Sequence, residues 1–322
     1  MRVPIQAISP EWRDLLLLFV AVSWGLTFLF TKMGLASFDT ATFAFLRTAG
    51  AAIVLNGFAL VHARRHGSAR LRPREHLAAI GLGLLGLTGF PYCFSQAMEA
   101  TSSTNGGLIF GATPVVVGVI SVTAGLERLR PANWLGLALS VAGIVAILFP
   151  ELSARGTASL SGDLLMVAAM LLWAAYTVLN RLLPRRISVL HMTAYASLWG
   201  VSGLALLNLR SLMEQDWSGA AGISWLGAAC AGVLGTGLAY IVWNLQVQRI
   251  GPARTAVSMN LVPVVSALAG FTLLEEPLGG RHLLAALLVI PGVALTQMAP
   301  QERSPSRERR APAPENRPTA PS

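Results

Sequence analysis

Ten long apolar stretches constrain the fold of this chain more than any other feature. Each has about 17 to 21 residues, enough for a helix with a rise of about 1.5 Å per residue to cross a hydrocarbon layer of roughly 30 Å. Backbone amides have no water to bond inside lipid, so each stretch is predicted to form a helix. The predicted fold class is all-α, a polytopic membrane protein with ten transmembrane helices. The stretches cover residues 14–34, 41–61, 77–97, 105–125, 133–150, 163–183, 190–209, 226–246, 254–274 and 282–298.

The composition excludes a soluble globular enzyme. Hydrophobic residues make up 54% of the chain and charged residues 12%, against roughly 25% charge in an ordinary soluble domain. Cys93 and Cys230 both lie inside apolar stretches, far apart in the sequence. They indicate neither a disulfide framework nor a CxxC metal site.

The distribution of positive charge predicts that both termini are cytoplasmic. The loops were divided between the two sides of the membrane. The side that holds the N-terminus and the tail has nineteen arginines, and the other side has four cationic residues (Lys32, Arg155, Arg210 and Arg281). By the positive-inside rule, residues 1–13 form a cytoplasmic N-terminus. Residues 299–322 contain six prolines and eight charged residues, a composition typical of a disordered, solvated tail.

The chain contains an internal duplication at an offset of 149 positions. The register pairs Asp14 with Asp163, Trp24 with Trp173, Lys32 with Arg181, Gly83 with Gly232, Gly86 with Gly235, and Pro114 with Pro263. Residues 14–150 and 163–298 are therefore predicted to be two copies of one five-helix unit. Since five is odd, the second copy enters the membrane from the other side. Inverted repeats of this kind are the architecture of alternating access in secondary transporters, although some channels share it.

Arg47 is the candidate anchor for a substrate carboxylate. It lies inside the second span, where an arginine is costly, and its counterpart in the second copy is Ala196. A guanidinium forms bidentate pairs with carboxylates. The alternatives are snorkelling to the membrane surface and a structural bond to helix carbonyls.

Aromatic and amide side chains predict a polar cavity near the midplane. Trp24 and Trp173 fall at the centres of their spans, where anchoring at the membrane surface does not explain an indole N–H. Other aromatic and amide residues have the spacing that puts them on one face of a helix. They are Trp173 with Tyr176 and Asn180, Tyr240 with Asn244, and Tyr92 with Gln96. The set suits a small zwitterion, and the alternative is packing between helices.

Pro114 and Pro263 are the candidate hinges. Each lies nine positions into its predicted span and in corresponding spans of the two copies. A proline there removes an amide and frees a carbonyl. Paired breaks of this kind point to the binding region and to the segments that flex. A static kink is the alternative.

Several common motifs of enzymes and ATP-driven pumps are absent from the sequence. There is no GxxxxGK phosphate loop, HExxH or GxSxG, so neither an enzyme nor direct use of ATP is indicated. The glycines Gly81, Gly83 and Gly86 lie within an apolar span, which favours close helix packing over a dinucleotide site. We expect no cofactor, metal or nucleic-acid partner. Every acid near a span lies at a boundary, which disfavours cationic cargo.

The two copies resemble the EamA repeat of the drug/metabolite transporter superfamily. The first carries SWG (Ser23 to Gly25), FLR (Phe45 to Arg47), TPVV (Thr113 to Val116) and LERL (Leu126 to Leu129). The second carries LLWAAYTVLNR (Leu171 to Arg181), GTGLAYIVWN (Gly235 to Asn244), the run from Gly251 through Pro263, and LEEPL (Leu274 to Leu278).

The resemblance implies a bacterial inner-membrane permease, often an exporter of amino acids or related small metabolites. Carriage of nucleotide sugars or lipid-linked sugars, and a passive channel, stay open as alternatives. The partners expected are a small-molecule substrate and the lipid bilayer, with the protein as a monomer or a homodimer. A shared scaffold does not identify the cargo.

Overall fold

The structure is a computed structural model of the 322-residue chain. It describes residues 10–67, 71–128, 157–183 and 186–275, with scattered residues between 130 and 143 and between 279 and 303. The predicted spans 133–150 and 282–298, and most of the tail, therefore lie outside the continuously described part of the chain.

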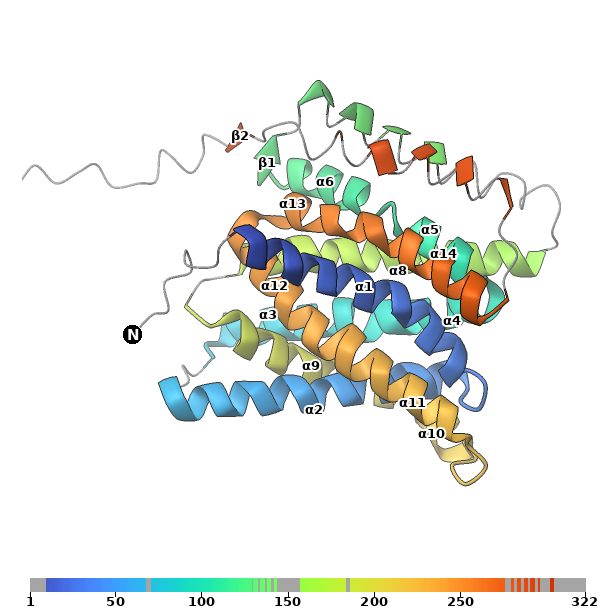
Figure 1. Cartoon of the computed structure of the whole chain (residues 1–322). Coiled ribbons are helices and arrows are strands. Elements are labelled where there is room, and N and C mark those ends of the chain that lie inside the picture. The colour runs from blue at the N-terminus through green and yellow to red at the C-terminus, as the bar shows by residue number, and fades with distance from the viewer. Residues whose placement is uncertain are drawn as a thin grey trace, which may run out of the picture.

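The described chain is a bundle of helices that lie side by side along one axis (Figure 1). Asp39, Ser102 and Ser188 begin three of them, because each side chain accepts a hydrogen bond from a backbone amide of the first turn. The helices of the first repeat are α1 (Pro10–Gly34), α2 (Thr40–His66), α3 (Pro73–Gly83), η1 (Leu84–Gly89), α4 (Phe90–Ala100), α5 (Ser103–Phe110) and α6 (Thr113–Thr123). Those of the second repeat are α8 (Thr157–Leu182), α9 (Val189–Leu207), α10 (Leu209–Glu214), α11 (Gly222–Cys230), η2 (Ala231–Leu238), α12 (Ala239–Ile250), α13 (Pro252–Ala256), η3 (Val257–Asn260) and α14 (Leu261–Leu273).

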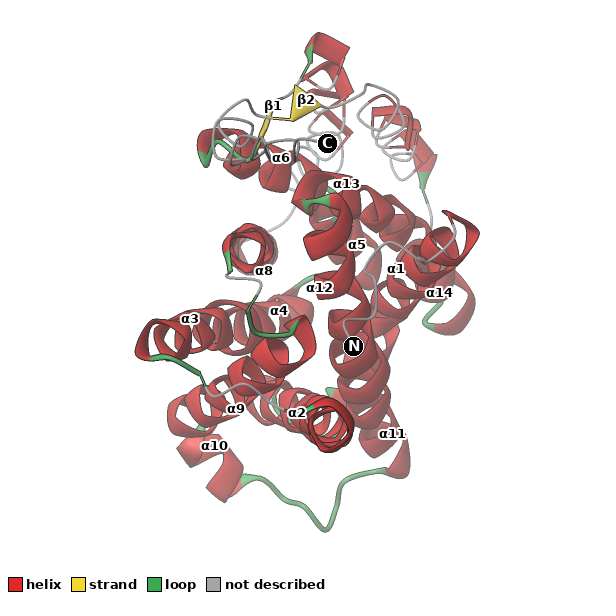
Figure 2. Ribbon diagram, turned by 90° about the vertical axis from the view of Figure 1, so that its left-hand side faces the viewer, coloured by secondary structure: helices red, strands yellow, loops and turns green. Residues whose placement is uncertain are grey.

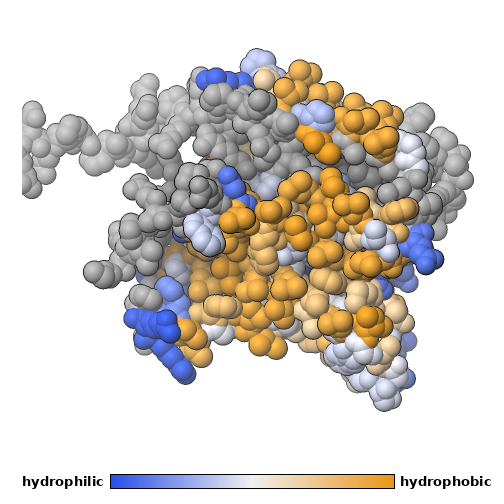
Figure 3. Space-filling model, viewed as in Figure 1, coloured by the Kyte–Doolittle hydropathy of each residue, from blue (hydrophilic) through white to orange (hydrophobic). Residues whose placement is uncertain are grey.

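Six helices of the described chain are long and apolar enough to cross a membrane: 14–34, 40–65, 73–100, 160–182, 189–207 and 222–250. Two shorter apolar helices are Thr113–Thr123 and Leu261–Leu273. The face of the molecule in Figure 3 has hydrophobic residues over the middle of the bundle and hydrophilic residues toward its ends. The all-helical membrane fold is confirmed, and the count of ten spans stays a prediction. The helix of the sixth predicted span begins at Thr157, and its candidate membrane-crossing part begins at Leu160 rather than at 163.

Spans four and nine are interrupted near the predicted hinges. Helix α5 ends at Phe110, and α6 resumes with Pro114 in its first turn. In the second repeat, η3 precedes Pro263 at the third position of α14. The ring at Pro114 leaves the Phe110 carbonyl without an amide donor from position 114, and the Thr113 hydroxyl bonds that carbonyl instead.

Spans three and eight carry a π-helical segment each, which the sequence did not predict. The segments are η1 and η2, and they overlap at the repeat offset. Glycines bring them against neighbouring helices. A Cβ added at Gly232 would lie 2.7 Å from the Arg47 carbonyl oxygen of α2, and one at Gly200 of α9 would lie 2.4 Å from Leu87 of η1. Side-chain-free positions thus allow close packing on both π-helical segments.

Corresponding contacts of the two repeats lie at opposite ends of the bundle. Lys32 donates to the carbonyl of Met98. Its counterpart Arg181 donates to the carbonyl of Val247, which is the counterpart of Met98. The Arg186–Glu75 ion pair likewise corresponds to the hydrogen bond between Ser37 and Ser224, whose hydroxyls are 3.0 Å apart. In each pair of contacts, one lies at the end where α1 begins, here called the N-terminal end, and the other lies at the opposite end (Figure 1).

The repeats pack together more closely at the opposite end. There the Thr101 hydroxyl donates to Asp163 at 2.9 Å, and a Cβ added at Gly162 would lie 2.8 Å from that of Ala100. The counterparts of Thr101 and Asp163 are Ile250, which is half-buried, and Asp14, which is exposed. Helix α12 also contacts α1 less extensively than α4 contacts α8. Viewed from the N-terminal end, α8 lies between α3 and α4 on one side and α5, α6 and α13 on the other (Figure 2).

Two tail residues pair with the loop after α6. Strand β2 (Glu302–Arg303) runs antiparallel to β1 (Glu127–Arg128), with Glu127 opposite Arg303. The rest of the predicted tail lies outside the described residues.

Candidate substrate-binding site

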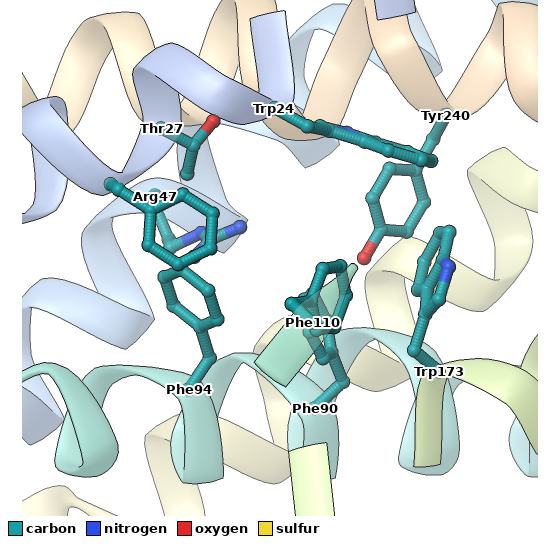
Figure 4. Close-up of a pocket in the computed structure, with 9 residues that line it drawn as sticks. Trp24, Thr27, Arg47, Phe90, Phe94, Phe110, Trp173 and Tyr240 are labelled. Carbon is teal, nitrogen blue, oxygen red and sulfur yellow. The ribbon is translucent and has the colours of Figure 1, made fainter. Parts of the chain in front are cut away.

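A small cavity lies inside the bundle and draws its lining from both repeats. It contains about 300 Å³ of space not filled by protein atoms, counted together with any opening. Figure 4 shows Arg47 and Phe94 on one side, Trp173 and Tyr240 on the other, and Phe90 and Phe110 between them. The lining residues are Trp24, Thr27, Phe28, Arg47, Phe90, Phe94, Phe110, Trp173 and Tyr240.

Arg47 carries the only formal charge among these lining residues. It is 2% exposed, so its side chain does not snorkel to the membrane surface. Its Nε and Nη2 atoms lie 3.4 and 3.2 Å from the hydroxyl oxygen of Thr236, which accepts both bonds. Its Nη1 atom has no hydrogen-bond partner in the described part of the chain. A buried guanidinium with an unpaired N–H can donate a hydrogen bond to an acceptor such as a carboxylate.

Aromatic rings surround this cation. The guanidinium carbon lies 5.9 Å from the Phe90 ring centre and 5.2 Å from that of Phe94, within cation–π range. None of the lining residues carries a carboxylate. The positive charge is therefore held by ring faces and one hydroxyl rather than by a resident acid.

The other end of the cavity is an aromatic cluster. The ring centres of Trp24 and Trp173 are 5.1 Å apart, and those of Trp173 and Tyr240 are 4.9 Å apart. Trp24 Nε1 donates to the carbonyl of Gly235 in η2 at 2.7 Å, and the Tyr240 hydroxyl donates to that of Gly86 in η1 at 2.9 Å. Each bond joins one repeat to the π-helical segment of the other.

Three predicted residues form a polar layer one helical turn beyond this cluster, toward the N-terminal end. Asn244 Nδ2 donates to the Tyr176 hydroxyl at 2.6 Å and to the Thr193 hydroxyl at 2.9 Å. The carbonyl oxygen of Asn180 accepts a bond from the Gln248 side chain. All of these residues except Gln248 are buried, but they do not line the cavity. The layer lies between the cavity and the C-terminal ends of α8 and α12, which are at the N-terminal end of the bundle.

Tyr92 and Gln96 are placed differently from the other predicted residues. Both are half-buried on α4, and neither lines the cavity. The side of α4 that faces the cavity carries Phe90 and Phe94 instead. Of the predicted residues, the structure thus brings Trp24, Arg47, Trp173 and Tyr240 together.

Sequence reasoning missed Thr236 and most of the apolar lining. Phe90 and Phe94 have the i, i+4 spacing of one helix face, and Thr27 and Phe28 follow Trp24 by one turn. These spacings were available, but in a chain this apolar they do not distinguish a cavity wall from a lipid-facing surface. Among the described residues, no cluster of three metal-ligating side chains occurs.

The chain has relatives among membrane transporters. It is 27% identical over 87% of its length to the uncharacterized transporter YyaM of Bacillus subtilis, covering 91% of that protein. It is 27% identical to the aromatic amino acid exporter YddG of Ancylobacter novellus, over 76% of this chain and 83% of that one. A probable amino-acid metabolite efflux pump of Salmonella typhimurium is 26% identical, over 86% and 92%. One solved crystal structure has a TM-score of 0.67 at 20% identity, over 90% of this chain and 98% of that one.

The fold and the comparisons define the class as a multi-pass membrane transporter rather than an enzyme. The EamA-like transporter family matches residues 11–149 and 160–298. The chain therefore belongs to that family, with two EamA domains, and the resemblance read from its motifs is confirmed.

Proposed function

We propose that this protein exports amino acids or related small metabolites across the bacterial inner membrane by alternating access. The observation that carries the proposal is Arg47, a buried cation with an unfilled donor in a cavity between the two repeats. The names of two relatives, an aromatic amino acid exporter and a probable amino-acid metabolite efflux pump, support the same cargo class.

The chemistry of the cavity favours a carboxylate with an apolar body. A carboxylate binds Arg47 with a charge-assisted hydrogen bond, strengthened by the low dielectric of the bundle. The rest of the cargo lies among Phe90, Phe110, Trp24 and Tyr240, where burial of apolar area stabilises it. Cationic cargo is disfavoured, because Arg47 repels it and the lining has no acid to compensate.

The packing of the bundle ends supports alternating access. The repeats contact each other closely at the end with Thr101 and Asp163 and less closely at the end with Asp14 and Ile250. By the positive-inside rule both termini are cytoplasmic, so the less closely packed end is the cytoplasmic one. Exchange of the two repeat conformations then opens the cavity outward.

The remaining predicted residues take supporting roles in this proposal. Tyr176, Asn180 and Asn244 form the polar layer that cargo crosses on the cytoplasmic side, and the breaks at Pro114 and Pro263 absorb the backbone changes. Tyr92 and Gln96 lie beside the cavity and are proposed to contact cargo only when α4 moves.

Counterflow in proteoliposomes tests the proposal. Vesicles loaded with an unlabelled amino acid take up the labelled one through a carrier, whereas a passive channel shows no such accumulation. Screening amino acids one at a time identifies the cargo, with nucleotide sugars as a comparison set. Counterflow by nucleotide sugars alone, or strong uptake of quaternary ammonium ions, would contradict the proposal.

Arg47 variants then test the anchor. We expect Arg47→Gln to lower counterflow by roughly tenfold or more, the loss typical of a charged hydrogen bond. Arg47→Lys retains the charge but not the fork and should fall in between. Arg210→Gln is the matched control, because Arg210 is exposed and paired with Glu214. Unchanged counterflow in Arg47→Gln would show that the carboxylate is bound elsewhere.

A further inference from the structure

The repeat symmetry is broken at one hydrogen bond beside the cavity. Trp24 and Trp173 are counterparts, and so are Gly235 and Gly86. Trp24 Nε1 donates to the Gly235 carbonyl. The symmetric bond would join Trp173 Nε1 to the Gly86 carbonyl. That bond is absent, and Trp173 Nε1 has no partner within the described chain although Trp173 is only 1% exposed.

Tyr240 occupies the acceptor that Trp173 lacks. Its hydroxyl lies 2.9 Å from the Gly86 carbonyl oxygen. The position that corresponds to Tyr240 in the first repeat is Pro91, which has no hydroxyl. Gly86 therefore has two candidate donors from the second repeat, whereas Gly235 has one from the first.

The Trp173 ring packs against the two tyrosines that contact Gly86. The Trp173 ring centre lies 4.9 Å from that of Tyr240 and 5.1 Å from that of Tyr176. Tyr176 in turn packs on Gly86, where an added Cβ would lie 2.3 Å from its ring. The carbonyl belongs to the π-helical segment η1, a type of segment common at functional sites.

We infer that Trp173 and Tyr240 are positioning residues that exchange at the Gly86 carbonyl during transport. In the state described here Tyr240 holds the carbonyl, and in the oppositely open state Trp173 Nε1 holds it. Both rings line the cargo cavity, so cargo that contacts them biases the exchange. The inference rests on the proposed alternating access, since the second bond follows from the first when the repeats exchange conformations.

Disulfide trapping of the two bundle ends tests this exchange. In a background with Cys93→Ala and Cys230→Ala, the opposite-end pair Thr101→Cys with Asp163→Cys reports the present state. The N-terminal-end pair Asp14→Cys with Ile250→Cys, placed at the same offset, reports the other state. The measurement is the rate at which each pair forms a disulfide in membranes under copper phenanthroline.

The two single variants should move these rates in opposite directions. Tyr240→Phe removes the present donor, so disulfide formation should rise at the N-terminal-end pair and fall at the opposite-end pair. Trp173→Phe should do the reverse, and the double variant should lie between them. Each change should be about two- to tenfold, the range of one net hydrogen bond. Tyr195→Phe and Trp199→Phe, on α9 and outside the cavity lining, serve as controls.

A replacement that keeps the ring shape guards against misfolding. Incorporation of 3-benzothienylalanine at position 173 replaces the N–H with sulfur and should act as Trp173→Phe does. Shifts in the same direction for Tyr240→Phe and Trp173→Phe, or none in either, would overturn the inference. If, instead, a protein that carries both cysteine pairs and keeps Trp173 and Tyr240 forms both disulfides in the same molecules while transport continues, the proposed alternating access fails, which is a separate result.

Discussion

At the scale of single residues, the partner of Arg47 is the feature that sequence reasoning could least supply. The cost of an arginine in an apolar helix made Arg47 a candidate anchor for a carboxylate, and the structure buries its side chain. Thr236 is 189 positions away and looks like any other threonine in an apolar span. Its role follows only from the packing of η2 against α2.

Thr236→Val should destabilise the protein by about 1–3 kcal/mol, because the variant leaves the buried guanidinium without an acceptor. Thr236→Ser keeps the hydroxyl and should remain close to the unmodified protein. Thermal unfolding in detergent, followed by size-exclusion chromatography, measures both. Thr123→Val is the control, since the Thr123 hydroxyl bonds its own helix at an exposed position. Equal stability of the valine and serine variants would show that Arg47 does not depend on this bond.

At the scale of elements, the sequence predicted positions better than conformations. The offset of 149 paired Lys32 with Arg181, which make corresponding contacts, and Pro114 with Pro263, which lie in the first turns of α6 and α14. It also paired Gly83 with Gly232 and Gly86 with Gly235. It did not predict that the segments containing or adjoining these glycines are π-helical. A π-helix depends on what packs against it, so a glycine pattern indicates close packing without specifying the hydrogen-bond register.

Gly232→Ala should destabilise the bundle by about 1–3 kcal/mol, the usual cost of overpacking. The added Cβ would lie 2.7 Å from the Arg47 carbonyl oxygen, a backbone atom that cannot move alone. Gly57→Ala is the matched control, because no atom lies within 4 Å of its added Cβ and alanine favours the helix. Thermal unfolding of the two variants, compared directly, measures the difference. A loss as large in Gly57→Ala as in Gly232→Ala would show that the effect is not one of packing.

At the scale of the whole molecule, the apolar pattern and the duplication predicted the helical membrane fold and its two related halves. Corresponding contacts at the two ends, such as Arg186–Glu75 and Ser37–Ser224, fit the inverted arrangement. The sequence did not indicate at which end the repeats pack more closely, because that depends on how the two halves come together in space. Asp163 is buried and accepts a bond from Thr101, whereas Asp14 is exposed and its counterpart partner Ile250 has no hydroxyl.

Trapping one end of the bundle while measuring transport tests the alternating-access account most directly. The opposite-end pair Thr101→Cys with Asp163→Cys joins positions whose side chains are hydrogen-bonded in this state. Oxidation in proteoliposomes should stop counterflow, and a reductant should restore it, while the cysteine-free protein is unaffected by either treatment. Counterflow that continues at its full rate after complete disulfide formation would contradict the account.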